Sequence, residues 1–274
     1  MFGKSLGGYE LIERINRGSL SEVYRARSAS TGEPAAVRVL LPELRDSPTA
    51  VRRFLRGARL EMRCDHPNIV KVLLIGESRT MPFVATELIP GDNLKRFIIE
   101  KRDVLRAKPI PILRAVAEAL AHLHHKQRII HRDVKPENVL LSEDASAVRL
   151  SDFGLAVEKR REYLTSKRIS GSPTYIAPER LLLRRYDERV DIYSLGIMAY
   201  ELLTLRLPYT GETEQELMRA HTDFRIKPEP IHRHNPGVGR AIAEAVFRSL
   251  EKDVQKRYPD VRLFIRDIKL SARH

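Results

Sequence analysis

The sequence is short of residues on which several protein classes depend. It has no tryptophan, a single cysteine, Cys64, and only 6% aromatic residues among 274. One cysteine excludes an internal disulfide and a zinc site made of four cysteines, so we expect a reducing compartment. No run approaches the roughly 18 uncharged apolar residues of a membrane helix, and the N-terminal residues lack a signal-peptide pattern. These absences predict a cytoplasmic protein without membrane insertion.

The composition otherwise favours a folded chain with a basic surface. Apolar residues make up 42% and charged residues 31%, enough to bury a core. The 49 Lys and Arg residues exceed the 36 Asp and Glu residues, which gives a formal charge of +13. Nucleic acid, anionic lipid, acidic substrates and phosphate all remain open as reasons for that surplus. Because no zinc-ligand set or aromatic-interleaved basic motif accompanies it, we expect no nucleic-acid partner.

Strand patterns fill the first third of the chain and helical patterns the rest. Short aliphatic and β-branched runs at residues 9–15, 22–27, 35–41, 71–76 and 82–87 predict a small antiparallel sheet. One helix interrupts them, with Ser47 as its cap and Pro48 as its first residue. Longer helices are predicted over residues 112–126, 187–205, 238–250 and 260–270. The predicted class is α+β, with two lobes and a ligand cleft between them.

Three motifs occur in a fixed order in the second lobe. His131 to Asn138 reads His-Arg-Asp-Val-Lys-Pro-Glu-Asn, Asp-Phe-Gly follows at residues 152–154, and Gly-Ser-Pro-Thr-Tyr-Ile-Ala-Pro-Glu occupies residues 171–179. Any one motif alone would be a weak signal, but a chance match of all three is negligible. The set resembles the catalytic loop, metal-binding motif and activation-segment end of eukaryotic-type (Hanks-type) serine/threonine protein kinases. The resemblance covers about residues 9–270.

The resemblance implies a bilobal kinase-like fold that forms a single domain over residues 1–274. The N-lobe would be a small antiparallel sheet with one helix (about 9–87), joined by a hinge (about 87–91) to a larger, mainly helical C-lobe (about 92–271). Asp191 would lie in a buried helix of that lobe. Glu179 and Arg257 would form a buried ion pair there.

The resemblance also implies catalytic roles. Asp133 would orient the attacking hydroxyl and take its proton, and Asn138 and Asp152 would supply oxygen ligands to Mg²⁺ or Mn²⁺. Lys135 would lie beside the transferred phosphoryl group, and together with Ser172 it favours serine and threonine over tyrosine acceptors. His131 is expected to be a packed, hydrogen-bonded core residue.

An ATP site is implied by residues from the glycine-rich loop, the neighbouring strands and the hinge. These are Asn16, Gly18, Ser21, Val23, Ala36, Arg38, Thr86, Glu87, Ile89 and Leu140. Glu87 to Ile89 would offer backbone hydrogen bonds to adenine, and Thr86 would border the pocket behind it. For the apolar members, plain core packing is an equal alternative.

Three departures from the family pattern bear on activity. The loop keeps only Gly18, because Asn16 and Ser21 replace its other two glycines, and Arg38 replaces the strand lysine that contacts the phosphates. The helix glutamate that should pair with that lysine falls at Gly57, which lowers the expected rigidity of the helix. The sequence therefore leaves two alternatives: a serine/threonine kinase of reduced activity, and a pseudokinase that binds nucleotide or presents surfaces to a partner.

Glu61 offers a replacement for the missing glutamate. It lies four residues after Gly57, about 40° around the helix and roughly 6 Å further along it. Arg38 is longer than lysine, so we hypothesise that it reaches Glu61. The alternatives are that Glu61 faces solvent, or that it pairs with Arg59 or Arg63. If the chain is an active kinase, the family pattern predicts that Arg38→Lys raises activity.

The basic residues concentrate around the expected substrate cleft. One group forms a helical stripe opposite the Phe54, Ala58 and Met62 side, and two others lie in or near the activation segment. The groups are Arg52, Arg56, Arg59 and Arg63; residues 159–161 and 167–168; and Arg180, Arg184, Arg185 and Arg189. We expect acidic protein substrates or partners, and a regulatory phosphate on Thr165, Ser166 or Ser170 held by Arg132. The alternative is an activation segment that is merely solvated.

Overall fold

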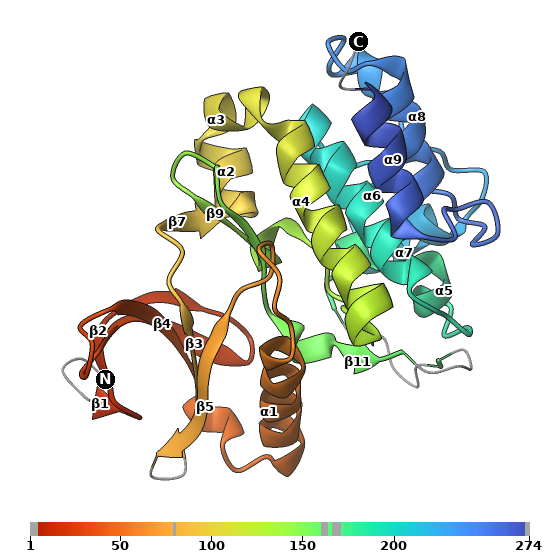
Figure 1. Cartoon of the computed structure of the whole chain (residues 1–274). Coiled ribbons are helices and arrows are strands. Elements are labelled where there is room, and N and C mark those ends of the chain that lie inside the picture. The colour runs from red at the N-terminus through yellow and green to blue at the C-terminus, as the bar shows by residue number, and fades with distance from the viewer. Residues whose placement is uncertain (1–4, 79–80, 160–163, 166–170, 272–274) are drawn as a thin grey trace.

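An antiparallel sheet of six strands forms most of the first lobe in the computed structural model, which describes residues 5–78, 81–159, 164–165 and 171–271 (Figure 1). The strands are β1 (Ser5–Leu6), β2 (Tyr9–Arg17), β3 (Ser21–Ser28), β4 (Pro34–Leu40), β5 (Val72–Ser78) and β6 (Met81–Glu87), in the order β1-β2-β3-β4-β6-β5. All five predicted strands are confirmed.

The alternation of side chains gives this sheet two different faces. Leu11, Tyr24, Val37 and Phe83 pack together on one face. On the other face, Val23 lies opposite Arg38 across β3 and β4, and Arg38 lies opposite Val84 across β4 and β6. Directly opposed residues share a face of the sheet. The candidates Ser21, Val23, Ala36, Arg38 and Thr86 therefore share this face, whereas Glu87 pairs with Ala35 and alternates to the opposite face.

Helix α1 (Pro48–Met62) packs against that second face. Ser47 caps it as predicted, because its hydroxyl accepts a hydrogen bond from the Ala50 amide at 3.3 Å. Phe54 and Ala58 pack with Leu40 and Val84 of the sheet. Of the side opposite the arginine stripe, Phe54 and Ala58 are buried but Met62 is 45% exposed, and Gly57 and Glu61 are turned inward.

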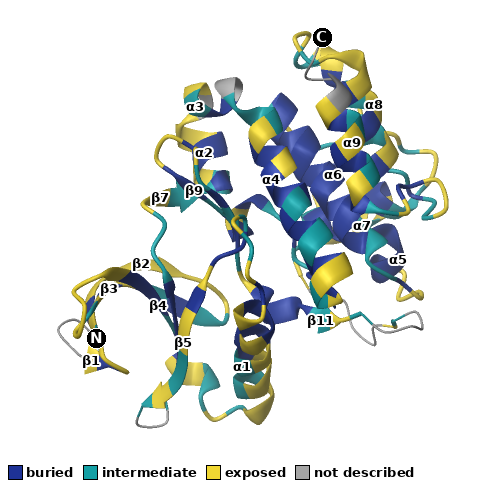
Figure 2. Cartoon of the chain, viewed as in Figure 1, coloured by how far each residue is buried: buried dark blue, intermediate teal, exposed yellow. Residues whose placement is uncertain are grey.

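The second lobe is mainly helical (Figure 1). Its helices are α2 (Leu94–Glu100), α3 (Arg102–Ala107), α4 (Pro109–His122), α5 (Pro178–Leu181), α6 (Arg189–Thr204), α7 (Glu214–Thr222), α8 (Arg240–Ser249) and α9 (Val261–Ser271). The four predicted long helices are confirmed as α4, α6, α8 and α9. Every residue of α6 after Arg189 is buried, and Figure 2 shows this helix enclosed by its neighbours.

Short strands between the lobes carry the sequence motifs. β7 (Gly91–Asn93), β9 (Val139–Ser142) and β10 (Val148–Leu150) form one small sheet, and β8 (Ile129–Ile130) pairs with β11 (Val157–Glu158). The His131 to Asn138 motif therefore connects β8 to β9, and the Asp-Phe-Gly motif follows β10.

Buried charges of the second lobe are paired as expected. Arg257 binds Glu179 through two hydrogen bonds of 2.8 and 3.1 Å, and both side chains are buried. This confirms the predicted ion pair. Within the described ranges, no helix has both the length and the apolar character needed to cross a membrane.

His221 is a buried histidine in α7. Its Nδ1 lies 2.8 Å from the Tyr193 hydroxyl, and its ring centre lies 5.0 Å from that of Tyr209. Burial, assisted by the charge of Lys252, lowers its pKa from 6.5 to about 4. The folded protein therefore keeps this imidazole neutral at pH values at which an unfolded histidine is protonated.

This difference predicts a stability that depends on acidity. Unfolding takes up a proton between pH 6.5 and about 4, so the free energy of unfolding should fall through that range as the pH falls, by up to about 3 kcal/mol. His221→Phe should remove this part of the dependence while lowering stability at pH 7. Denaturant unfolding from pH 7.5 to pH 4 measures it. The exposed His232, changed to Phe, is the control; equal pH dependence in wild type and His221→Phe would contradict the interpretation.

Candidate active site

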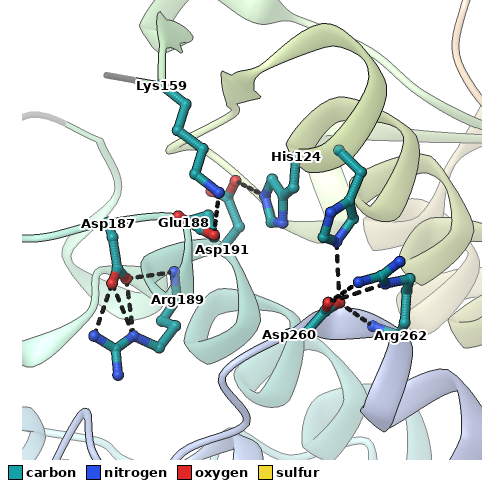
Figure 3. A network of polar contacts seen from close by, with 9 residues as sticks. His124, Lys159, Asp187, Glu188, Arg189, Asp191, Asp260 and Arg262 are labelled. Carbon is teal, nitrogen blue, oxygen red and sulfur yellow. Dashed lines mark hydrogen bonds and ion pairs between the residues drawn. The ribbon is translucent and has the colours of Figure 1, made fainter. Parts of the chain in front are cut away.

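The loop from His131 to Asn138 is anchored by Asp191 of α6. The Asp191 carboxylate accepts hydrogen bonds from the backbone amides of His131 (2.8 Å) and Arg132 (2.7 Å), and from His124 Nε2 (2.8 Å; Figure 3). Burial alone would raise the pKa of Asp191, but the hydrogen bond and charge of His124, together with the backbone bond from Arg132, hold it below its usual value. Asp191 therefore stays ionised inside the lobe and fixes the path of the loop.

Arg132 adopts a left-handed backbone conformation with φ of 70°. Such a conformation is costly for a residue with a side chain and persists where its surroundings fix it. Asp191 holds its amide, and Arg180 Nη1 donates to its carbonyl oxygen at 2.8 Å. The strained residue thus directs the chain into Asp133.

Asp133 lies in a small polar cluster. Lys135 Nζ is 2.9 Å from Asp133 Oδ2, and Asn138 Nδ2 donates to the Asp133 carbonyl (2.8 Å) and carboxylate (2.9 Å). The fully buried His131 accepts from the Asp133 amide at 3.3 Å and donates to the Ser151 carbonyl at 3.1 Å. These bonds confirm His131 as a packed core histidine.

A cavity of about 540 Å³ opens above this cluster. It is lined by Gly18, Ser19, Leu20, Ser21, Arg38, Arg53, Phe54, Gly57, Ala58, Val84, Asp133, Lys135, Asp152, Phe153, Gly154, Leu155, Gly171 and Ser172. Six residues that the sequence assigned to chemistry or nucleotide binding thus share one cavity: Gly18, Ser21, Arg38, Asp133, Lys135 and Asp152. Asn16, Val23, Ala36, Thr86, Glu87, Ile89, Asn138 and Leu140 are not part of its lining.

Residues toward the hinge lie in strands and make internal contacts. Thr86 is buried, and its hydroxyl donates to the Ala36 carbonyl at 3.4 Å. The Glu87 carboxylate accepts from the Lys71 amide (2.9 Å) and Arg149 Nε (3.3 Å). The Glu87 carboxylate and the Glu87 backbone amide, which donates to the Lys71 carbonyl at 2.9 Å, are therefore both occupied by protein.

Of the two candidate oxygen ligands, Asn138 contacts Asp133 and Asp152 lines the same cavity as Asp133. Asn138 uses its amide nitrogen on Asp133, which leaves the carbonyl oxygen as its ligand atom. Asp152 has a left-handed φ of 60°, and its Oδ1 accepts from the Gly154 amide at 3.1 Å. In the described part of the chain, no group of three His, Cys, Asp or Glu residues gathers as a metal site. Two oxygen donors fit Mg²⁺ that is completed by phosphate oxygens and water.

Arg38 of β4 contacts Glu61 of α1. Arg38 Nη2 and Glu61 Oε2 form an ion pair in which Glu61 is fully buried. Burial would lower the pKa of Arg38, but the carboxylates of Glu61 and Asp152 raise it above its usual value, so the cation is retained. Arg63 instead pairs with Glu158 at 2.7 Å. The alternatives of a solvent-facing Glu61 and of a pair with Arg59 or Arg63 were wrong.

Gly57 is the point at which α1 meets the Asp-Phe-Gly segment. A Cβ atom at residue 57 would lie 2.7 Å from the Phe153 carbonyl oxygen and 3.1 Å from the Gly154 Cα. These distances are shorter than ordinary contacts, so no side chain fits there without movement of the backbone. Glycine at this position lowers helix propensity, but it also allows α1 to lie close to the backbone of the Asp-Phe-Gly segment.

Two residues of this region were missed by sequence reasoning. Arg53 lines the cavity, and its Nε donates to the Gly154 carbonyl at 3.1 Å. Its spacing of four residues from Gly57 places both on one side of α1, which could have identified it. His124 follows α4 in a π-helical turn, Leu123–Gln127, and only its position next to the motif pointed to a role.

Part of the predicted basic surface is internal. Arg180 is 3% exposed, and burial, assisted by the charge of Arg132, lowers its pKa to about 10. Arg189 binds Asp187, and Lys159 binds Glu188 at the start of α6 (Figure 3). Arg184 and Arg185 are exposed. The prediction that this group as a whole faces substrate was therefore wrong for Arg180 and Arg189.

Of the regulatory candidates, Thr165 lies in the described chain, whereas Ser166 and Ser170 lie outside it. Thr165 is exposed and follows Leu164, whose backbone forms two hydrogen bonds of 2.9 Å with Tyr186. The Tyr186 ring centre is 5.5 Å from the Arg132 guanidinium carbon. Thr165 is thus linked to the neighbourhood of Arg132 through Tyr186.

Comparison with known proteins agrees with this arrangement. The family model for the protein kinase domain matches residues 9–264. A probable serine/threonine-protein kinase of Clostridium perfringens is 33% identical over 271 residues, which are 98% of this chain and 39% of that protein. The serine/threonine-protein kinase PrkC of Bacillus subtilis is 29% identical over 98% of this chain and 41% of its own length. PknB of Mycobacterium tuberculosis is 31% identical over 91% of this chain and 40% of its own. The chain spans about two fifths of the length of these relatives, and it belongs to the protein kinase family.

Proposed function

We propose that this chain is a protein kinase that transfers the γ-phosphoryl group of ATP to serine or threonine hydroxyls of proteins. The observation that carries the proposal is the cluster of Asp133, Lys135 and Asn138, with Asp152 in the same cavity as Asp133 and Lys135. The relatives named serine/threonine kinases support it. The pseudokinase alternative rests on the departures at Asn16, Ser21, Arg38 and Gly57, and these relatives do not favour it.

The proposed reaction assigns one task to each residue of the cluster. The acceptor oxygen forms a bond to the γ-phosphorus as the bond to the β-phosphate oxygen breaks, and the hydroxyl proton passes to the Asp133 carboxylate. Asn138 fixes that carboxylate by hydrogen bonding, and Lys135 brings a positive charge beside it. Phosphoryl transfer depends mainly on such positioning and charge stabilisation.

Asn138 and Asp152 would hold Mg²⁺, or Mn²⁺ in its place. When bound with ATP, the metal ion neutralises charge on the phosphate oxygens. Gly18, Ser21 and Arg38 would face the phosphates. Toward the hinge, we assign Val23, Ala36 and Leu140 to the adenine faces, the backbone of Glu87 and Ile89 to its edge, and Thr86 to the rear of the pocket, with Asn16 in the loop above.

We also propose that residues 1–274 form one kinase domain, with the hinge near residues 87–91. Protein substrates are the expected partners. Exposed Arg184 and Arg185 near the activation segment favour acidic ones.

Asp133→Asn should lower the rate of phosphoryl transfer by at least about 100-fold, because the amide cannot take the hydroxyl proton. The assay is transfer of labelled phosphate from Mg-ATP to a generic protein substrate and to the chain itself. Asp46→Asn, at an exposed aspartate, is the control. Full activity in Asp133→Asn would contradict the proposed base, whereas a nucleotide-induced thermal shift in a wild type that transfers no phosphate would favour the pseudokinase.

We propose further that phosphate on Thr165, Ser166 or Ser170 orders the activation segment through Arg132. Arg132 is partly buried, and burial together with the nearby cations Arg56 and Arg53 lowers its pKa. An anion beside it would relieve that repulsion.

Incubation with Mg-ATP should therefore place phosphate on peptides from residues 158–170, as measured by mass spectrometry. Phosphatase treatment should then lower kinase activity several-fold, because charge-assisted hydrogen bonds to Arg132 are lost. Thr165→Ala tests one acceptor, and Thr49→Ala, at an exposed threonine of α1, is its control. Unmodified peptides throughout this range in an active enzyme would count against the proposal.

A further inference from the structure

We propose that Glu61 is the positioning residue for Arg38, and that Gly57 makes this possible. The carboxylate that holds the phosphate-contacting cation has moved one helical turn along α1, together with a change of that cation from lysine to arginine. This inference rests on the proposed function, because it assigns Arg38 to the phosphates of ATP.

The first step of the argument is the space at residue 57. A Cβ atom there would lie 2.7 Å from the Phe153 carbonyl oxygen, 2.9 Å from its carbon and 3.1 Å from the Gly154 Cα. These are backbone atoms, which cannot turn aside as a flexible side chain does. A glutamate at residue 57 would therefore push α1 away from the Asp-Phe-Gly segment.

The second step is the position of Glu61. It is one turn further along the helix and, like Gly57, faces inward. It is fully buried, and it contacts Arg38. A buried carboxylate requires a cation or hydrogen-bond donors, so Arg38 and Glu61 each depend on the other.

The third step is the shape of the cation. Arg38 extends from β4 on the face of the sheet that packs on α1, and it also lines the cavity that contains Asp133 and Asp152. Its Nη2 binds Glu61, while 17% of the Arg38 side-chain surface stays exposed and the residue lines the cavity. After Glu61 has been bound, part of the guanidinium therefore remains within reach of phosphate oxygens. Lysine is shorter and carries a compact point charge, so it cannot hold Glu61 and reach phosphate at the same time as the longer, planar guanidinium can.

The expected effect of Arg38→Lys is thereby reversed. The family pattern alone predicts a gain, whereas the shifted pair predicts a loss, because the lysine would leave Glu61 buried without its partner. Gly57→Ala should also be harmful, although alanine favours a helix more than glycine does.

The experiment is a double-mutant cycle with Arg38→Lys, Glu61→Gln and both changes together. We would measure the dissociation constant for Mg-ATP by titration of a fluorescent nucleotide analogue, and kcat and KM for ATP in the transfer assay. Each single change should lower kcat/KM by about tenfold or more. The double variant should be little less active than the less active of the two single variants, because both changes remove the same interaction. Additive losses, or a gain in Arg38→Lys, would overturn the proposal.

Matched variants separate positioning from folding. Glu77→Gln removes an exposed carboxylate of β5 and should leave nucleotide affinity unchanged. Gly57→Ala should weaken Mg-ATP binding more than Gly239→Ala, where an added Cβ has nothing within 4 Å.

Glu61→Asp keeps the charge and should recover part of the affinity lost in Glu61→Gln, measured on protein with a complete thermal unfolding transition. Equal affinity in Asp and Gln variants would overturn the proposal.

The binding measurement keeps the two proposals distinguishable. A wild type that binds Mg-ATP but transfers no phosphate would contradict the proposed kinase activity, while the cycle on affinity would still test Glu61. A wild type that binds no nucleotide would overturn both.

Discussion

The ionised carboxylate of Asp191 is the constraint on which the rest of the site depends. It satisfies the amides of His131 and Arg132 at the point where the chain takes a left-handed turn, and it is held in turn by His124. Loss of this group would leave two amide donors without their buried partner. From that turn the chain leads directly to Asp133. A single anion inside α6 therefore determines where the proposed base lies.

The two lobes build their halves of the cavity in different ways. In the C-lobe, several hydrogen bonds to backbone and to buried groups together hold Asp133 and Asn138 in place, so their positions do not depend on one bond alone. In the N-lobe, the cation at Arg38 is held by one carboxylate and by the close packing of α1 at Gly57. The departures from the family pattern lie in the half that depends on fewer contacts. A change of the phosphate-contacting cation there therefore requires matching changes at the residues that hold it, here Gly57 and Glu61.

Periodicity explains how much of the fold could be predicted. Strands of seven to nine residues and the long, mostly apolar run of α6 can be seen in the sequence, whereas β1, β8 and β11 have two residues each and are too short to show a pattern. In the site, ordered motifs predicted Asp133, Asn138 and Asp152, and helical geometry predicted Arg38 as one of several possible partners for Glu61. The packing of Gly57 against Phe153 could not be predicted, because it joins residues almost a hundred positions apart. The burial of Arg180 and the hydrogen bond from Arg189 to the Val254 carbonyl are likewise tertiary effects.

The internal arginines change the meaning of the positive charge. Arg132 and Arg180 both lie near the ring of Tyr186. Burial lowers the pKa of both, assisted by the charges of Arg56 and Arg53 for Arg132 and by that of Arg132 for Arg180. Aromatic contact and the Arg132 carbonyl offset part of that cost. An anion brought to this place would gain from the low dielectric surroundings, whereas an acidic surface approaching Arg52 or Arg184 would meet well-solvated charges. Among these described arginines, the partly buried Arg132 is therefore the one to which we assign the proposed phosphate, whose charge-assisted hydrogen bonds suit such surroundings.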